Sequence, residues 1–479
     1  LKTPSFCGVG WGGPDTLQQL VFQAEQTYNR FLQQLEDDYP AYYDLKYTTN
    51  EPPQVAEVQA ALANKQLLIE YFVGQDSIYT FAIGKADMEL FALPKPTGFA
   101  DSVTLYRELV TNGIEQDCMT EFIRLSRWFY GLLLFLPVTF ADDAPERLVI
   151  IPDGLLNFLS FESLLYKDID RLRGVEGFLI ERFATSYAYS SKLLLEEQFY
   201  PRSANKGFVG FGLEYDDATL DYLKDLEFGK VDVDTTFQNP CGAIDTTRYL
   251  GKLTYSDDEV EDIAAITGGD SWLNEDVRKD IFMDVAGDYQ QLHLAMHGSY
   301  DLEFPMNSSL LFTHTDSTDV FLRAAEIYGM ELAGEMVVLS ACNTAYGKLQ
   351  AGEGPMTLAR AFHYAGIPAV VATLWSLPDN SASKIMRLFY EELDQGHPKD
   401  IALRNAKLAY LADDNLSSPI TRQPAHWAPA VVIGDISPVA SRWKWWHYGL
   451  GLAFLGLAGW MIRSRGSLVA PVLTASSVN

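Results

Sequence analysis

Short apolar runs alternate with amphipathic segments along most of this chain. Runs of strand length occur at residues 147–152, 207–212, 368–375 and 428–434, and two more lead into His297 and Cys342. Between them, apolar residues recur every three or four positions at 257–267, 276–286, 355–365, 381–395 and 400–412. Because strands separated by helices pair in parallel, this pattern predicts an α/β fold with a mostly parallel sheet flanked by helices.

The first part of the chain has a different pattern. A helical periodicity from about residue 16 to 47 is interrupted at Pro40, and strand-like segments follow at 67–74, 77–84 and 88–93, with a hairpin turn between the first two. An aromatic-rich helix is then predicted over 118–136, ended by Pro137. We further expect a surface insertion over 214–255, a hairpin over 305–318 and a helix over 321–328.

Two of the buried strands end in residues with reactive side chains. The run before Cys342 stops at small polar residues, and the run before His297 continues into Gly298. Open α/β sheets place their chemistry just beyond the carboxyl ends of strands. A thiol next to an imidazole gives a cysteine nucleophile and its base, whereas a lone cysteine after an apolar run is usually a small buried hydrophobe. The pair of strand ends favours the first interpretation.

Charge and cysteine content limit which partners, metal sites and cellular compartments fit this chain. The chain has 479 residues, enough for two or three domains, and its 64 Asp and Glu against 36 Lys and Arg give a formal net charge of −28. Such a charge repels phosphate backbones, so no nucleic-acid partner is expected. The four cysteines lie far apart, which indicates neither a zinc site nor a disulfide framework and favours a reducing cytosol. We expect no cofactor and no metal, because no P-loop or G-x-G-x-x-G follows any predicted strand and no EF-hand-like loop is found.

Several motifs resemble the CHAT domain, a bacterial branch of the caspase, separase and gingipain clan of cysteine endopeptidases. The opening motif lies at 151–164, and further motifs lie at 352–355, 359–362, 365–368 and 372–375, together with Cys342 and His297. The resemblance covers most of the span from about Leu67 to Asp435. It implies a caspase-like fold and an endopeptidase that cleaves protein partners through a dyad of Cys342 and His297. A non-catalytic CHAT-fold scaffold or signalling module is the alternative.

The resemblance also implies further site residues. The backbone amides of Gly298 and Cys342 are the candidates for the oxyanion hole. Asp379 follows the strand after Cys342, where the clan builds the pocket for the side chain before the scissile bond and where separase-like members use a carboxylate to receive an Arg. The simpler interpretation makes Asp379 or Asn380 the N-cap of the following helix. His293 is interpreted as a histidine that packs in the core or supports the site residues from behind, rather than as a catalytic one.

The tail contains a long run without formal charge, from Trp445 to Ile462, between basic residues at both ends. At 1.5 Å per helical residue it reaches about 27 Å, close to the roughly 30 Å hydrocarbon core of a bilayer. Tryptophans near both ends fit an aromatic belt. We therefore predict a single-pass membrane anchor with the catalytic domain in the cytoplasm, since no signal peptide is found and the CHAT proteins that this chain resembles are cytosolic.

These observations divide the chain into three parts. Residues 1–58 are expected to form a helical connector, which resembles the link that follows tetratricopeptide repeats, so an upstream repeat domain or regulatory protein is an expected partner. A start at Leu1 rather than Met favours a stretch cut from something longer. Residues 59–438 form the peptidase domain, with an N-terminal β and helix subdomain over 59–140 and the catalytic sheet over 145–438. Residues 442–479 are the anchor and tail.

Overall fold

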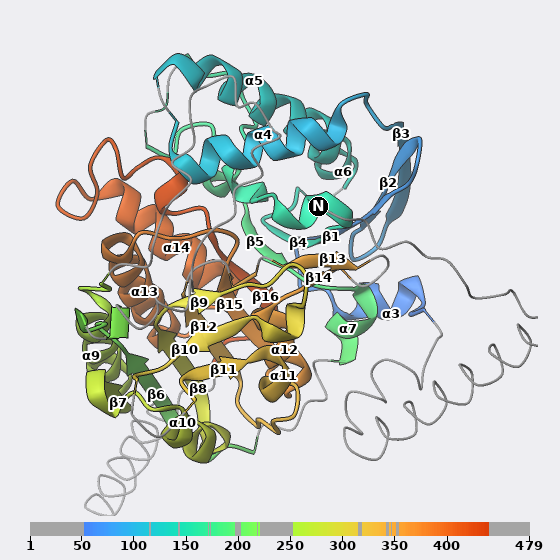
Figure 1. Cartoon of the computed structure of the whole chain (residues 1–479). Coiled ribbons are helices and arrows are strands. Elements are labelled where there is room, and N and C mark those ends of the chain that lie inside the picture. Colours follow the sequence, from blue (N-terminus) through green and yellow to red (C-terminus); the bar gives the residue numbers. More distant parts are fainter. Residues whose placement is uncertain are drawn as a thin grey trace, which may run out of the picture.

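The computed structural model describes residues 52–439 except 115, 142–143, 171, 173, 197–202, 218, 221–251, 315–318, 342–343, 346 and 351–353. Within the described residues, a sheet of 11 strands has the order β3-β2-β1-β4-β5-β16-β15-β12-β8-β6-β7. Helices lie against both of its faces (Figure 1). The predicted mixed α/β class, with a large and mostly parallel sheet flanked by helices, is confirmed.

One half of the sheet begins at an antiparallel edge. β3 (Met88–Pro94), β2 (Ser77–Ile83) and β1 (Gln66–Val73) are antiparallel neighbours, and the predicted turn between β1 and β2 is present, with the Gly74 amide donating to the Ser77 carbonyl at 2.9 Å. β1 is parallel to β4 (Arg147–Ile151), followed by β5 (Ala184–Tyr187) and β16 (Ala430–Gly434). The three strands expected in a small N-terminal subdomain therefore extend the main sheet.

The other half carries the candidate site. β15 (Ala369–Thr373), β12 (Met336–Ser340), β8 (Tyr289–Ala295), β6 (Lys206–Gly212) and β7 (Asp270–Leu273) are mutually parallel. β15 meets β16 in antiparallel pairing, and this pair joins the two halves. β12 and β15 consist almost entirely of buried apolar residues, as parallel strands covered on both faces require.

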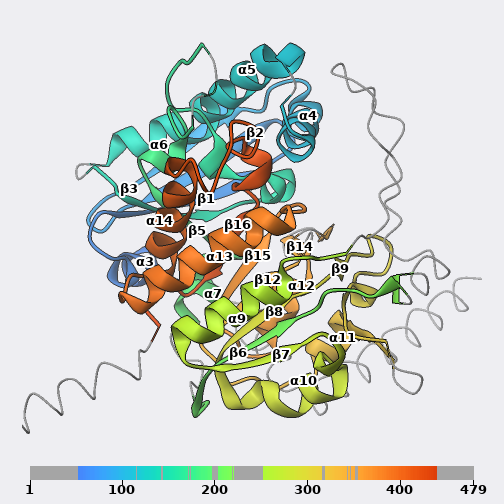
Figure 2. The same cartoon turned by 90° about the vertical axis from the view of Figure 1, so that its left-hand side faces the viewer.

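Amphipathic helices cover this half on both faces. α9 (Ser256–Thr267), α13 (Asp379–Asp394) and α14 (Lys399–Ala412) lie side by side on one face (Figure 2). In α13 the buried apolar residues recur at helical spacing, which gives the helix one continuous face for the sheet: Ala382, Ile385, Met386, Phe389, Tyr390 and Leu393. α12 (Leu358–Tyr364) packs against β15 from the opposite side of the sheet (Figure 1).

The remaining elements are short or lie at the periphery. The helices are α3 (Val55–Ala61), α4 (Phe99–Asn112), α5 (Met119–Phe129), α6 (Phe135–Phe140), α7 (Ser191–Glu196), α10 (Lys279–Val285) and α11 (Ala324–Ile327). A three-stranded sheet contains β9 (Gly298–Ser299), β10 (Ser309–Leu311) and β11 (Phe321–Arg323). β13 (Lys348–Gln350) and β14 (Gly354–Met356) form a hairpin.

The local structure differs from the sequence prediction in three places. The aromatic helix does not end at Pro137, because a π-helical turn over Tyr130–Leu134 shifts the hydrogen-bond pattern and α6 continues through the proline to Phe140. The segment predicted as a helix from residue 321 starts as strand β11, which pairs with β10, and only its second half is helical. The surface insertion expected over 214–255 includes Tyr215, which is buried.

Three expectations fall outside the described residues. They are the helical connector up to residue 51, the nucleophile Cys342, and the anchor from Trp445 to Ile462. In the part of the chain that is described, no helix combines the length and apolar character needed to cross a bilayer.

Candidate functional site

The two strands that lead to His297 and Cys342 are direct neighbours. β8 and β12 run parallel, with Leu339 opposite Leu294 and Ser340 opposite Ala295. Their carboxyl ends therefore meet at the same edge of the sheet. His297 comes two residues after Ala295, and Cys342 comes two residues after Ser340. Cys342 itself lies outside the described residues, whereas its chain neighbour Ala341 is described and buried.

His297 is buried and lies against Tyr215. The two rings stack with centroids 4.5 Å apart and an angle of 29° between their planes. The backbone amide of His297 donates to the Tyr215 hydroxyl at 2.9 Å, and that hydroxyl donates to the Leu311 carbonyl at 2.7 Å. Tyr215 follows β6, the neighbour of β8, so the sheet itself brings the two rings together.

Gly298 begins the short strand β9 and lies opposite Leu310 of β10. The neighbouring ladder bond runs from the Leu311 amide to the His297 carbonyl at 3.0 Å. In antiparallel strands, hydrogen-bonded and non-hydrogen-bonded residue pairs alternate. His297 and Leu311 form a hydrogen-bonded pair, so the next pair, Gly298 and Leu310, is non-hydrogen-bonded, and the amides of such a pair point away from the partner strand. The Gly298 amide therefore points away from β10.

The backbone on both sides of positions 342 and 343 is fixed by Thr373, the last residue of β15. Its hydroxyl donates to the Ala341 carbonyl at 2.5 Å, and its amide donates to the Thr344 hydroxyl at 3.0 Å. Its carbonyl accepts from the Ala345 amide at 2.9 Å. Thr344 and Thr373 are both buried, so these bonds lie in an environment that excludes water.

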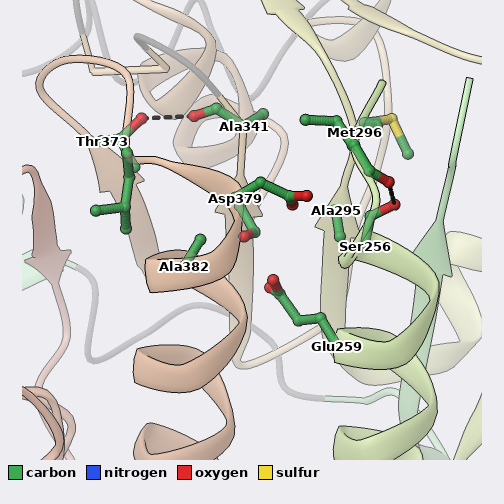
Figure 3. Close-up of a pocket in the computed structure, with 11 residues that line it drawn as sticks. Ser256, Glu259, Ala295, Met296, Ala341, Thr373, Asp379 and Ala382 are labelled. Carbon is green, nitrogen blue, oxygen red and sulfur yellow. Dashed lines mark hydrogen bonds between the residues drawn. The ribbon is translucent and has the colours of Figure 1, made fainter. Parts of the chain in front are cut away.

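A small pocket opens at this edge of the sheet (Figure 3). Its floor comes from the ends of β8, β12 and β15, and its walls come from the first turns of α9 and α13. The side chains of Asp379 and Glu259 both point into the space between these helices (Figure 3). The lining residues are Leu253, Ser256, Glu259, Ala295, Met296, Ser340, Ala341, Thr373, Leu377, Asp379 and Ala382.

Asp379 does not serve as a helix cap. α13 begins at Asp379 itself, the cap position is Pro378, and no side chain caps the helix. The Asp379 carboxylate instead accepts from the Tyr255 amide at 2.9 Å, just before α9 begins. The interpretation of Asp379 as an N-cap is therefore wrong, because its side chain faces α9 rather than its own helix. Asn380 lies inside the first turn of α13, so it is not the cap either.

The environment of Asp379 disfavours its charge. Burial raises the pKa of this carboxyl from its ordinary value to about 6, and the nearby carboxylates of Glu259 and Asp257 act in the same direction. The hydrogen bond from the Tyr255 amide opposes the shift only in part. Among the described residues Asp379 has no ion pair, so the pocket has an acidic side chain and no cation to neutralise it.

Glu259 is the pocket residue that the sequence prediction missed. Its side chain is buried and accepts from His293 Nε2 at 2.8 Å. The interpretation of His293 as a packed histidine is confirmed by its complete burial. Glu259 shares the buried face of α9 with Ser256, Val260 and Ile263, and a carboxylate on that otherwise apolar stripe was the signal in the sequence.

Cysteine pairing departs from the prediction. Cys118 is buried before α5 and is disulfide-bonded, and the other three cysteines of the chain lie outside the described residues. The sequence analysis expects no disulfide framework and does not predict the disulfide bond of Cys118, since distance along the sequence does not report which cysteines a fold brings together. Within the described residues, no group of three or more His, Cys, Asp and Glu side chains is arranged to hold a metal ion.

Comparison with known proteins identifies a family match for most of the chain. The model of the CHAT domain matches residues 123–435. Tetratricopeptide repeat protein 28 of Mus musculus is 30% identical over 117 residues, which are 24% of this chain and 4% of that protein. Its Homo sapiens counterpart is 29% identical over 117 residues, with the same shares. The matched segment is thus a small part of these relatives.

Two solved structures are distantly similar to the chain. The Arg specific cysteine proteinase gingipain R is 10% identical with a TM-score of 0.34, covering 72% of this chain and 76% of that one. The separase–securin complex of Saccharomyces cerevisiae is 12% identical with a TM-score of 0.36, covering 72% of this chain and 20% of that one.

Proposed function

Because the chain belongs to the CHAT domain family, we propose that it is a cysteine endopeptidase that cleaves protein partners through Cys342 and His297. The observation that carries the proposal is the parallel pairing of β8 with β12, which sets Ala295 opposite Ser340. Each candidate residue follows its strand by the same number of positions. Equal offsets beyond paired positions bring the two residues to the same edge of the sheet, and a nucleophile must lie within hydrogen-bond reach of its base.

The proposed reaction is acyl transfer through a thioester. With an ordinary thiol pKa of about 8.5, Cys342 is only a few per cent ionised at pH 7, so His297 must accept its proton. The thiolate attacks the scissile carbonyl carbon, and the imidazolium then protonates the departing amine as the C–N bond breaks. Water, deprotonated by the neutral imidazole, hydrolyses the thioester and releases the second product.

We assign the oxyanion hole to the backbone amides of Gly298 and Cys342. The direction of the Gly298 amide, away from β10, supports this assignment. Donors aimed at the developing oxyanion are typically worth about 3 kcal/mol each. Glycine at position 298 also lets a substrate backbone come close, because it has no Cβ.

We propose that the acidic pocket receives the side chain that precedes the scissile bond, and that this side chain is Arg or Lys. Asp379 faces the same pocket as Ala341 and Met296, the residues directly before Cys342 and His297. Burial and the neighbouring acids disfavour the charged form of Asp379. A bound cation would stabilise that charged form, so the pocket favours a cationic side chain. Glu259 supplies a second negative group at the same place.

The dyad is tested by Cys342→Ala and His297→Ala on a confirmed protein substrate. Each variant should lose at least about 10³-fold in kcat while its melting temperature stays within a few degrees of wild type. His397→Ala, on the half-buried turn after α13, is the matched control and should keep full activity. Near wild-type cleavage by either dyad variant would contradict the proposed mechanism.

Alkylation provides a second test that needs no substrate. Under reducing conditions iodoacetamide should modify Cys342 faster than Cys7, Cys118 and Cys241, because only Cys342 is paired with an imidazole in the proposal. Equal reactivity of all four cysteines would support the alternative, a CHAT-fold scaffold without catalysis.

We further propose that the run from Trp445 to Ile462 tethers the peptidase to a membrane, with the catalytic domain in the cytoplasm. Support comes from its length and from the lack of formal charge. The disulfide at Cys118 removes cysteine usage as an argument for this orientation. Full-length protein should stay in the membrane pellet after alkaline carbonate washing, and a version ending at Val439 should be soluble and active. Release of the full-length protein would exclude a spanning anchor.

The proposed partners are a protein substrate and an upstream repeat region. The sequence match to tetratricopeptide repeat protein 28 supports a repeat-domain context, because that protein is named for such repeats. Attaching the natural upstream sequence should change which proteins are cleaved, and an unchanged substrate set would contradict this proposal.

A further inference from the structure

Tyr215 contacts both the side chain and the main chain of His297. The stacked rings have centroids 4.5 Å apart, and the Tyr215 hydroxyl accepts from the His297 amide at 2.9 Å. The same hydroxyl donates to the Leu311 carbonyl at 2.7 Å, while the Leu311 amide donates to the His297 carbonyl at 3.0 Å. The peptide groups on both sides of the His297 Cα are therefore held by Tyr215 and β10.

We infer that Tyr215 is the positioning residue of His297, an inference that rests on the proposed role of His297 as the general base. Its hydroxyl fixes the main chain from which the imidazole projects. Its ring face limits the rotation of the imidazole, because a turned ring would collide with the tyrosine. Tyr215 touches no reacting atom in this account and acts through His297 alone.

The stacking has an electrostatic consequence. The face of an aromatic ring is negative, so it stabilises the imidazolium relative to the neutral imidazole. In the proposed reaction the resting pair is a thiolate and an imidazolium, so the Tyr215 ring favours the reactive ionisation state of Cys342. The hydroxyl and the ring thus make separable contributions, one to geometry and one to charge.

Two variants separate these contributions in the full-length protein. Tyr215→Phe keeps the ring face and removes the hydroxyl, so kcat should fall about tenfold with KM and the pH profile little changed. Tyr215→Leu removes both, so kcat should fall further. The pH midpoint for alkylation of Cys342 by iodoacetamide should then rise by about half a pH unit toward the ordinary thiol value.

Tyr187→Phe is the matched control. The hydroxyl of this buried tyrosine also accepts a hydrogen bond from a backbone amide, that of Phe161, at 3.0 Å. Tyr187, however, lies on β5, which is four strand positions from β8 in the sheet. At about 4.8 Å per strand, this is about 19 Å away. Tyr187→Phe should cost stability comparable to Tyr215→Phe while leaving kcat and the alkylation profile unchanged.

The outcomes separate the role of Tyr215 from the proposed function of Cys342 and His297. If alkylation of Cys342 depends on His297 but both Tyr215 variants match wild type, the inference about Tyr215 is wrong and the dyad stands. If all variants of Tyr215 and Tyr187 lose activity only in proportion to stability, Tyr215 is a packing residue. If Cys342 reacts no faster than the other cysteines and His297→Ala changes nothing, the proposed function itself fails.

Discussion

In the half of the sheet that contains β4 and β16, buried charged side chains have partners of opposite charge, whereas the pocket beyond β8, β12 and β15 holds two carboxylates together. Lys407 of α14 is fully buried, pairs with Glu162 and donates to the Ala430 carbonyl at 2.5 Å. Arg147 makes two hydrogen bonds, of 2.6 and 2.7 Å, to Asp400.

The pairs in that half tie helix α14 to the sheet and to the opening motif, which contains Glu162. The pocket half provides no such partner for Asp379 among the described residues. The buried charges that stabilise the fold are thus paired with oppositely charged side chains of the same chain. A buried carboxylate without one costs stability, and an external cation can repay that cost by binding.

The largest expected effect comes from breaking a built-in pair. Lys407→Met should lower the free energy of unfolding by about 3–5 kcal/mol, because it leaves the Glu162 carboxylate buried and unpaired. Urea denaturation followed by circular dichroism measures the loss. The double variant Lys407→Met/Glu162→Leu should recover most of it. A loss below about 1 kcal/mol for the single variant would contradict the view that this pair supports the fold.

The next largest effect is expected from neutralising the pocket. Asp379→Asn should lower kcat/KM for peptides with Arg before the cut about 10- to 100-fold, the effect of losing one charge-assisted contact, and should leave neutral peptides unaffected. Asp400→Asn is the control with opposite behaviour, since it should destabilise the fold and leave the preference for Arg unchanged. Cleavage confined to apolar or acidic residues at that position would contradict the role of Asp379.

The smallest effect concerns pH. Burial raises the pKa of Asp379 to about 6, so below this pH the carboxyl is neutral and the preference for Arg over citrulline should weaken. For stability the sign is opposite to that of a paired acid. In the unfolded chain the group ionises near its ordinary pKa, so between about pH 4 and 6 the ionisable Asp379 increasingly disfavours the folded state.

The stability of Asp379→Asn tests whether the ionised Asp379 carboxylate destabilises the folded state. Its melting temperature should equal that of wild type near pH 4 and exceed it near pH 7.5. Equal values at both pH values would show that the folded pocket does not penalise the charge.

The sequence predicted the parts of the site that depend on strand order. Apolar runs before His297 and Cys342 identified two strands, and β8 and β12 are neighbours as expected. Contacts between distant segments were not predictable from local pattern. The sequence pattern predicts a surface position for Tyr215, which is in fact buried against His297, because none of its neighbours in the sequence indicates a ring 82 residues away.

Helix termination shows a similar limit. Pro137 predicts a helix end from its missing amide, but the π-helical turn before it rearranges the hydrogen bonds so that the helix continues. For Asp379, the position after β15 correctly predicts a place at the pocket, whereas the local prediction of a helix cap is wrong. Its carboxylate bonds to the Tyr255 amide just before α9, and α9 lies across the pocket from α13.

The most direct test of the central claim compares protein termini in cells that carry the wild-type chain, Cys342→Ala or His297→Ala at equal expression. A dyad predicts new termini in the wild-type cells alone, with Arg or Lys before the cut, and no difference between the two variants. The same termini in all three kinds of cell would show that the chain does not cleave proteins through Cys342 and His297.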